Sequence, residues 1–196
     1  MILLLSRAAV IALLATGVVV ALTEASCEEP GSRCEGTSEG DRIAGTNGPD
    51  GIYANGGDDL VVGYDGDDLV YGGEGHDTLY GKGGADTISG EAGPDYLSGQ
   101  WGRNTLHGGE GGDTISGDYG EDRIYGGEGD DTIEAGSVYR ASVSEPDEYR
   151  DLIDCGPGTD TVSYERDVDR VESNCEYKYR MPVYPTPSSE VSREGN

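Results

Sequence analysis

The chain has no phenylalanine, one tryptophan and two histidines among its 196 residues, and tyrosine, with 13 copies, is its only abundant aromatic residue. Basic residues are also scarce: 13 Lys and Arg stand against 39 Asp and Glu, a net charge of −26. Such an acidic chain repels phosphate backbones, which excludes nucleic acid as a natural partner. His76 and His107 are the only histidines and fit no catalytic triad, and we expect no enzymatic activity.

Glycine and aspartate are abundant instead, and they recur with a period of nine residues over residues 36–134. Eleven consecutive segments follow the pattern G-G-x-G-x-D-x-U-x, where U is aliphatic, and residues 72–80 are the clearest copy. Position one is Gly in all but Ala54, position four is Gly in all but Glu39, and position six is Asp in all but Asn104. Position eight is always Ile, Val or Leu. The segment is therefore a regular repeat array.

Each nonapeptide combines a short strand with a glycine-dependent turn. The aliphatic residue at position eight stands between mostly polar neighbours, which is typical of a strand with one side chain pointing inward. Two nonapeptides then make one flattened coil, and successive coils stack as parallel strands roughly 4.8 Å apart. The pattern predicts an all-β fold, a right-handed parallel β-roll or β-helix solenoid. Residues eighteen apart form two core columns: Ile43, Val61, Leu79, Leu97, Ile115 and Ile133, and Ile52, Val70, Ile88, Leu106 and Ile124.

The same period stacks the acidic residues along two edges of the predicted roll. Adjacent carboxylates about 5 Å apart repel by roughly 3 kcal/mol at an effective dielectric near 20. Two buried aliphatic side chains per coil do not offset the ordering of a glycine-rich coil, so we expect no stable fold without a counter-ion. A hard divalent cation between stacked turns would bridge the acids, and glycine carbonyls would complete an oxygen cage that suits calcium better than magnesium. Metal binding would then drive folding.

The repeat register breaks after Glu134, at an insertion of residues 135–145. It resumes in three degenerate repeats at 146–154, 155–163 and 164–172. We expect residues 146–179 to form a disulfide-braced C-terminal cap, because the end of a solenoid must be shielded. Only the second degenerate repeat keeps Gly at position four, so its position-six residue, Asp160, is added to the predicted metal-binding residues. These residues are Asp41, Asp50, Asp59, Asp68, Asp77, Asp86, Asp95, Asn104, Asp113, Asp122, Asp131 and Asp160.

Charge counting is consistent with many bound ions. Residues 36–134 hold 22 acidic and 4 basic residues, a net charge of −18. One ion in each gap between stacked turns would give about nine divalent ions, which nearly neutralise the roll. The alternatives are a metal-free roll with a solvated acidic surface, or a disordered acidic tail. Neither alternative explains why Asp recurs at position six of the repeat with Gly two residues before it.

The termini differ from the array in composition. Residues 2–22 are almost wholly apolar, and residues 1–25 are predicted to be a secretory signal peptide, cleaved near Ala25. An uncleaved membrane anchor is the alternative, but the uninterrupted apolar stretch at 8–22 is short for a span. We therefore expect a secreted chain with no stable membrane insertion after cleavage. Residues 180–196 are predicted to be a disordered tail.

Four cysteines flank the array and allow three pairings. We favour Cys27 with Cys34, in an N-terminal loop at 26–35, and Cys155 with Cys175. The second pair lies about one coil apart in sequence, which is within disulfide reach on an adjacent rung. A zinc site is the competing use of four cysteines, but the chain has no C-x-x-C spacing.

On these motifs the chain resembles the hemolysin-type, or repeats-in-toxin (RTX), calcium-binding proteins. The resemblance implies that the position-six side chains and the turn carbonyls bind calcium in a parallel β-roll. Asn104, Glu39 and Ala54 depart from the consensus, and we expect weaker calcium binding there. Typical members are also exported by an uncleaved C-terminal signal, and here no protease, lipase or toxin domain precedes the roll.

Position nine of alternate repeats forms a mostly aromatic column: Tyr53, Tyr71, Ser89, His107 and Tyr125. Two interpretations are open, rung-to-rung stacking that supports the sheet, or a platform for glycan or another surface ligand. The main functional prediction is a secreted, non-enzymatic calcium-binding β-roll that folds on binding extracellular calcium. The alternative is a calcium-dependent adhesin or extracellular matrix component, and a fragment of an enzyme or toxin is third.

Overall fold

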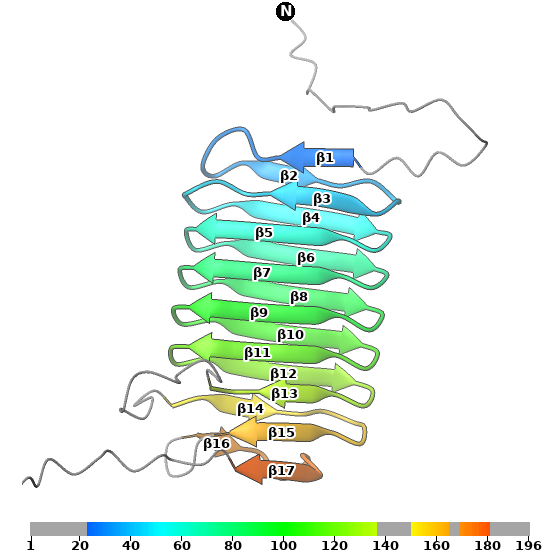
Figure 1. Cartoon of the computed structure of the whole chain (residues 1–196), viewed down its shortest axis with the longest axis vertical. Coiled ribbons are helices and arrows are strands. Elements are labelled where there is room, and N and C mark those ends of the chain that lie inside the picture. The colour runs from blue at the N-terminus through cyan, green and yellow to red at the C-terminus, as the bar shows by residue number, and fades with distance from the viewer. Residues whose placement is uncertain (1–22, 137–149, 165–168, 181–196) are drawn as a thin grey trace, which may run out of the picture.

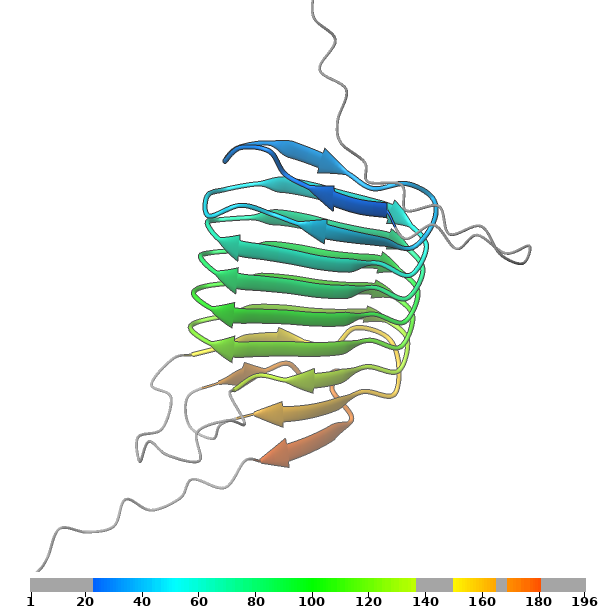
Figure 2. The same cartoon turned by 45° about the horizontal axis from the view of Figure 1, so that its top comes forward.

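The computed structural model describes residues 23–136, 150–164 and 169–180, and every regular element in these ranges is a β-strand (Figure 1). The strands alternate between two parallel sheets that lie face to face, and the chain winds from one to the other through tight turns (Figure 2). None of the described residues forms a helix, and hence none forms one able to cross a membrane. The predicted all-β parallel β-roll is confirmed.

Each sheet takes every second strand of the chain. The first sheet contains, in spatial order, β1 (Thr23–Ser26), β3 (Asp41–Ala44), β5 (Leu60–Asp65), β7 (Thr78–Gly83), β9 (Tyr96–Trp101), β11 (Thr114–Tyr119), β13 (Thr132–Glu134), β15 (Thr161–Tyr164) and β17 (Tyr177–Arg180). The second contains β2 (Arg33–Glu35), β4 (Gly51–Gly56), β6 (Leu69–Glu74), β8 (Thr87–Ala92), β10 (Thr105–Glu110), β12 (Arg123–Glu128), β14 (Leu152–Asp154) and β16 (Arg170–Val171).

The strand register follows the predicted eighteen-residue coil. Val61 on β5 pairs with Leu79 on β7, and the same offset holds from rung to rung through the array. Ile124 on β12 pairs with Ile153 on β14, although the predicted insertion at 135–145 lies between them. The insertion, most of which lies outside the described residues, therefore leaves the core columns in register.

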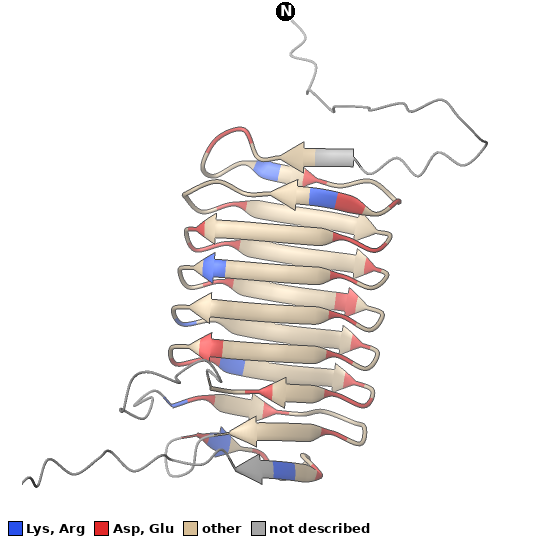
Figure 3. Cartoon of the chain, in the orientation of Figure 1, with Lys and Arg blue, Asp and Glu red and all other residues tan. Residues whose placement is uncertain are grey.

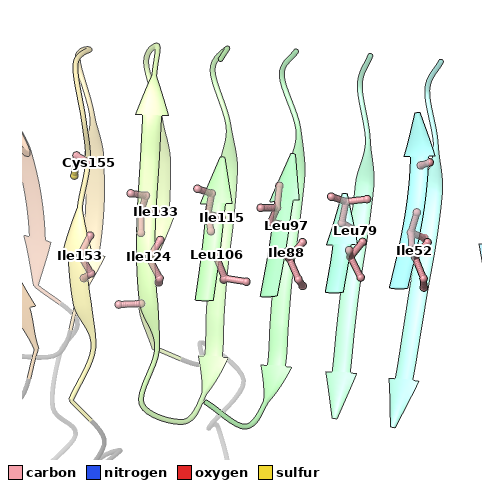
Figure 4. Close-up of a cluster of buried hydrophobic side chains, with 14 of the residues drawn as sticks. Ile52, Leu79, Ile88, Leu97, Leu106, Ile115, Ile124, Ile133, Ile153 and Cys155 are labelled. Atoms are coloured by element: carbon pink, nitrogen blue, oxygen red, sulfur yellow. The ribbon is translucent and has the colours of Figure 1, made fainter. Parts of the chain in front are cut away.

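The interior is a narrow file of aliphatic side chains, one from each array strand (Figure 4). The position-eight residues of both predicted columns are at most 2% exposed, and Ile153 and Val162 of the cap continue them. Position one is buried beside position eight but is almost always glycine. The core therefore contains no ring, which explains how a chain without phenylalanine can fill it.

Glycine at position four is required by the turn backbone. Gly102, for example, has a φ of +126°, and a Cβ placed on it would lie 1.7 Å from the carbonyl oxygen of Gly84 one coil earlier. From the third repeat onward, position two also lies in the left-handed region. The sequence pattern did not indicate this, because six of these positions carry residues other than glycine. They are Asn55, Tyr64, Lys82, Glu91, Gln100 and Asp118, with φ between 66° and 83°.

Disulfides close both ends of the described roll. Cys27 pairs with Cys34, and Cys155 pairs with Cys175, so the favoured pairing is confirmed and the structure shows no free cysteine for a zinc site in its described residues. The Cys155–Cys175 bridge joins the residue that follows β14 to a residue two positions before the start of β17. This is the predicted disulfide-braced cap.

Two features at the ends of the roll were not expected. β17 adds a further strand to the cap, and its Tyr177 pairs with Thr161 at an offset of sixteen rather than eighteen. β1 pairs with β3 and contains the predicted cleavage point near Ala25. The rest of the predicted signal peptide and residues 181–196 of the predicted tail lie outside the described residues.

The turn conformations predict opposite effects for two neighbouring substitutions. Gly102→Ala should lower the free energy of unfolding by about 2 kcal/mol or more, because the new Cβ meets backbone at a positive φ. Gln100→Gly should raise it by up to about 1 kcal/mol, because it removes a side chain from a left-handed backbone position. Denaturant titrations at one saturating calcium concentration measure both. Changes of the same sign would contradict the assigned turn.

Candidate metal-binding site

The position-six residues lie at the two edges of the roll, where the strands give way to the turns. Acidic residues concentrate in these turns on both sides of the molecule (Figure 3). All twelve predicted metal-binding residues are buried, and none is more than 5% exposed. The alternative of a solvated acidic surface is therefore wrong for these positions, because surface acids keep their carboxylates in water.

A hydrogen bond links each position-six residue to the next coil. The N–H of Asp59 donates to Oδ1 of Asp77 at 2.9 Å, and the N–H of Asp77 donates to Oδ1 of Asp95 at 2.8 Å. The pattern continues into the cap, where the N–H of Asp131 donates to Oδ1 of Asp160 at 2.9 Å. The two acid columns predicted from the repeat period are thus present, and each acid is oriented by its neighbour.

The other carboxylate oxygen is the chemically notable one. In ten of the predicted residues one buried carboxylate oxygen has no hydrogen-bond partner among the described residues: Asp41, Asp50, Asp59, Asp68, Asp77, Asp86, Asp95, Asp113, Asp131 and Asp160. A buried anionic oxygen without a partner is strongly destabilising. A regular series of such oxygens indicates a ligand set for cations.

Position-one glycine leaves room beside the unpartnered oxygens of Asp68, Asp77, Asp86, Asp95, Asp113 and Asp131. A Cβ on Gly72 would lie 2.3 Å from Oδ2 of Asp77 and 2.8 Å from the carbonyl oxygen of Gly90, one coil later. On the opposite edge, a Cβ on Gly81 would lie 2.3 Å from Oδ2 of Asp86. A carboxylate oxygen and a carbonyl oxygen from adjacent coils therefore face the same small space. Glycine at position one is needed for this space and not for an unusual φ.

Burial raises the pKa of several position-six carboxyl groups. Desolvation raises the pKa of Asp59, Asp86 and Asp95 from the ordinary 3.8 to about 7. It raises the pKa of Asp68 and Asp131 to about 6. Neighbouring carboxylates raise these pKa values further, whereas the N–H from the preceding coil lowers them. Close to neutral pH the roll thus holds carboxylates that ionise fully only if a positive charge is supplied.

The donor set favours a hard cation. No three side chains of His, Cys, Asp or Glu converge anywhere in the described part of the chain, so side chains alone do not form a cage. Turn carbonyls must complete it, and the arrangement around Gly72 provides them. Calcium accepts mixed carboxylate and carbonyl oxygens in flexible geometry, whereas magnesium usually retains several waters. The residues present therefore fit calcium.

Asn104 occupies a position-six site but presents a different atom. Its Oδ1 accepts the N–H of Asp86 at 3.0 Å, which fixes the orientation of the amide. Its Nδ2 is therefore turned toward Gly99, where the other repeats place a carboxylate oxygen, and has no hydrogen-bond partner among the described residues. An amide N–H₂ has hydrogens and no lone pair to offer a cation. We expect this gap to bind calcium more weakly than the others.

The structure also shows residues at the ends of the columns that sequence reasoning missed. Thr46 donates its N–H and its hydroxyl to Oδ2 of Asp50, at 2.7 and 2.9 Å, and Thr37 contacts Asp41 in the same way. At the other end the N–H of Asp160 donates to Oε2 of Glu176 at 2.9 Å. The sequence feature that could have indicated the threonine contacts is the presence of threonine at position two in the first two repeats only.

The predicted aromatic column forms two stacked pairs. Tyr53 and Tyr71 stack with centroids 5.2 Å apart, and His107 and Tyr125 stack at 4.6 Å. Ser89 pairs with both Tyr71 and His107 and separates the two pairs. Rung-to-rung stacking is therefore confirmed within each pair.

Comparison with known proteins agrees with this geometry. No curated protein matches the chain. The RTX calcium-binding nonapeptide repeat family matches in four copies, at residues 35–70, 71–106, 80–115 and 107–137. The matched copies cover more than half of the chain and include the position-six residues of all eleven repeats. The chain therefore belongs to the RTX calcium-binding repeat family.

Proposed function

We propose that this calcium-binding β-roll is a secreted, non-enzymatic protein that folds when it binds extracellular calcium. The observation that carries the proposal is the series of buried carboxylate oxygens without hydrogen-bond partners. A chain that folded without a cation would have to bury these groups uncompensated. Calcium converts their repulsion into bridging, so binding and folding are one event.

The composition of the gaps supports a site tuned to high calcium concentrations. Each gap offers few carboxylates together with carbonyl oxygens, and low ligand charge lowers calcium affinity. Extracellular modules bind calcium with dissociation constants on the order of 0.1–1 mM. The two disulfides are also consistent with an oxidising compartment outside the cytosol.

The two histidines support a non-enzymatic role. His76 is an exposed turn residue whose N–H donates to Oδ1 of Asp58 at 3.0 Å. His107 stacks on Tyr125 on the outer face of the second sheet. The two side chains belong to different parts of the repeat, and neither has the hydrogen-bonded base and nucleophile geometry of covalent catalysis in the described residues.

A calcium-dependent adhesin or matrix component is the second candidate. A hollow beside Tyr53 and Tyr71 on the second sheet favours it, because paired aromatic side chains and polar neighbours can bind a glycan or another surface ligand. In that case calcium would act through the fold, and the outer face of the sheet would carry the recognition.

Folding by calcium is tested on the chain from Ser26 to Asn196. At pH 7.5 in excess chelator we expect a circular dichroism spectrum without β structure, and a cooperative gain of β structure as calcium rises through the millimolar range. Magnesium at the same concentration is the control and should produce much less structure. A β spectrum that persists in excess chelator would contradict the proposal.

The raised pKa values predict a specific pH dependence. In the calcium-free fold these aspartates hold protons up to pH 6–7, whereas unfolded aspartate loses them near 3.8. The stability of the calcium-free fold should therefore be greatest below about pH 4 and fall as pH rises toward 7. In calcium-free, chelator-treated protein the β-structure signal in circular dichroism should therefore rise as pH falls from 7.5 to 4. A signal that does not change over this range would contradict the buried, protonated columns.

Asn104 allows the stoichiometry to be changed by one residue. Asn104→Asp restores a carboxylate oxygen beside Gly99, and we expect about one more calcium per chain at saturation together with a lower calcium midpoint. Asn47→Asp is the matched control, because it adds the same charge at an exposed turn position outside the columns. Equilibrium dialysis counts the ions. Equal changes in the two variants would show that net charge, and not the column, decides binding.

A further inference from the structure

The second sheet carries a hollow of about 200 Å³ on its outer face, away from both acid columns. Tyr53, Tyr71, Asn55 and Glu91 line it. The tyrosines come from position nine of β4 and β6, and the other two residues come from position two of their strands. Two neighbouring columns of the sheet therefore form the walls.

Small residues leave this hollow open. Gly73 pairs with Asn55 on one side and Glu91 on the other, and it contributes no side chain between them. Ser89 follows Tyr71 in the aromatic column, where a further ring would continue the stack. The rings of Tyr71 and His107, which flank Ser89, lie two rungs or roughly 10 Å apart. The column thus lacks one ring-sized layer next to Tyr71.

A tyrosine of the same column, Tyr53, already binds an arginine side chain of this chain. The guanidinium Cζ of Arg33 lies 3.9 Å from the ring centroid of Tyr53. The same guanidinium pairs with Glu35, two residues further along β2, with 2.6 Å between Nε and Oε1. Arginine is therefore held between an aromatic face and a carboxylate, the pairing that planar cations favour.

The hollow repeats these two elements without an arginine. Tyr71 provides the ring, and Glu91 provides the carboxylate two residues beyond Ser89 on the adjacent strand β8. At the Arg33 site the carboxylate lies directly beside the ring, because Glu35 pairs with Tyr53. No basic side chain lines the hollow, and the chain carries a net charge of −26. Charge complementarity therefore favours a cation over a neutral or anionic ligand.

We propose that the hollow over Gly73 and Ser89 binds an arginine side chain of a partner peptide, with its guanidinium stacked on Tyr71 and paired with Glu91. The site requires the folded, calcium-loaded roll but no part of the acid columns. It gives the protein a recognition function for arginine-containing partners.

The test is a titration of the calcium-loaded chain with the blocked tripeptide Gly-Arg-Gly in 150 mM salt, followed by NMR. We expect saturable shifts of the amide signals of Tyr71, Ser89 and Glu91. The lysine tripeptide has the same charge without the planar group, and the citrulline tripeptide has a similar shape without the charge. Both should bind at least about fivefold more weakly. Citrulline loses the cation–π contact of about 1 kcal/mol, and the lysine ammonium cannot stack flat on Tyr71 while pairing with Glu91 through two N–H groups.

Two variants place the site. Ser89→Tyr fills the open layer and should abolish the shifts while the circular dichroism spectrum and the calcium midpoint stay as in the parent. Glu91→Gln should weaken binding about fivefold or more. The backbone tolerates this change, because Gln100 occupies the equivalent position two at a similar φ. Glu128→Gln, which removes an exposed acid two rungs away, is the charge control and should have no effect.

Several results would overturn the proposal. One is equal binding of the arginine and lysine tripeptides, which would show attraction by net charge alone. Another is binding of methyl glucoside, but not of the arginine peptide, to the same residues, which would make the hollow a glycan site. Failure of the calcium-loaded chain to show a β spectrum would instead count against calcium-dependent folding, so the two proposals fail separately.

Discussion

The burial of like-charged carboxylates in two columns is the constraint on which the rest of the roll depends. Each position-six acid gives one oxygen to the backbone of the preceding coil, and in most repeats the other oxygen is left for a cation. Backbone oxygens must then lie close to the carboxylates, and position one is glycine in ten of the eleven repeats. Because glycine fills most of these inward positions, only a thin aliphatic core remains.

Much of this architecture could be predicted because it repeats. A period of nine residues determines the strand register, the core columns and the acid columns. The repeat can still be recognised after the insertion of eleven residues that follows Glu134. The pairing of Cys155 with Cys175 was also accessible, since their separation is close to one coil. Each of these features depends on sequence spacing, which a single chain displays directly.

Features that occur once could not be predicted in the same way. The left-handed backbone at Tyr64 and Lys82 leaves no trace in the sequence, because ordinary side chains occupy a position where the backbone is strained. Glu176 replaces an aspartate at an offset of sixteen, so the period does not reveal it. The orientation of the Asn104 amide depends on which neighbour donates to it. The hollow beside Tyr71 depends on Gly73 and Ser89, two small residues in different columns that become neighbours only in the folded sheet.

Calcium and the disulfides stabilise different parts of the molecule. In the proposed mode of binding, calcium acts between neighbouring coils along the array, whereas the disulfides act at the two ends, where a coil has a neighbour on one side only. A solenoid is weakest at such ends, because its stability is the sum of contacts between adjacent repeats. The covalent bonds therefore lie where the ions contribute least.

The hydrogen bonds between the acids all run in one direction, from the N–H of one coil to the carboxylate of the next. The stack is therefore polar, and its two ends are chemically different. A second copy could extend it only head to tail, an association that does not close and leads to filaments. Thr37 and Thr46 donate to Oδ2 of the first acid of each column and leave its Oδ1 without a hydrogen-bond partner among the described residues, whereas Glu176 accepts from Asp160 at the far end of the first column. The molecule thus has the internal order of a fibre, with an open acceptor end at Asp41 and Asp50 and a capped end at Glu176.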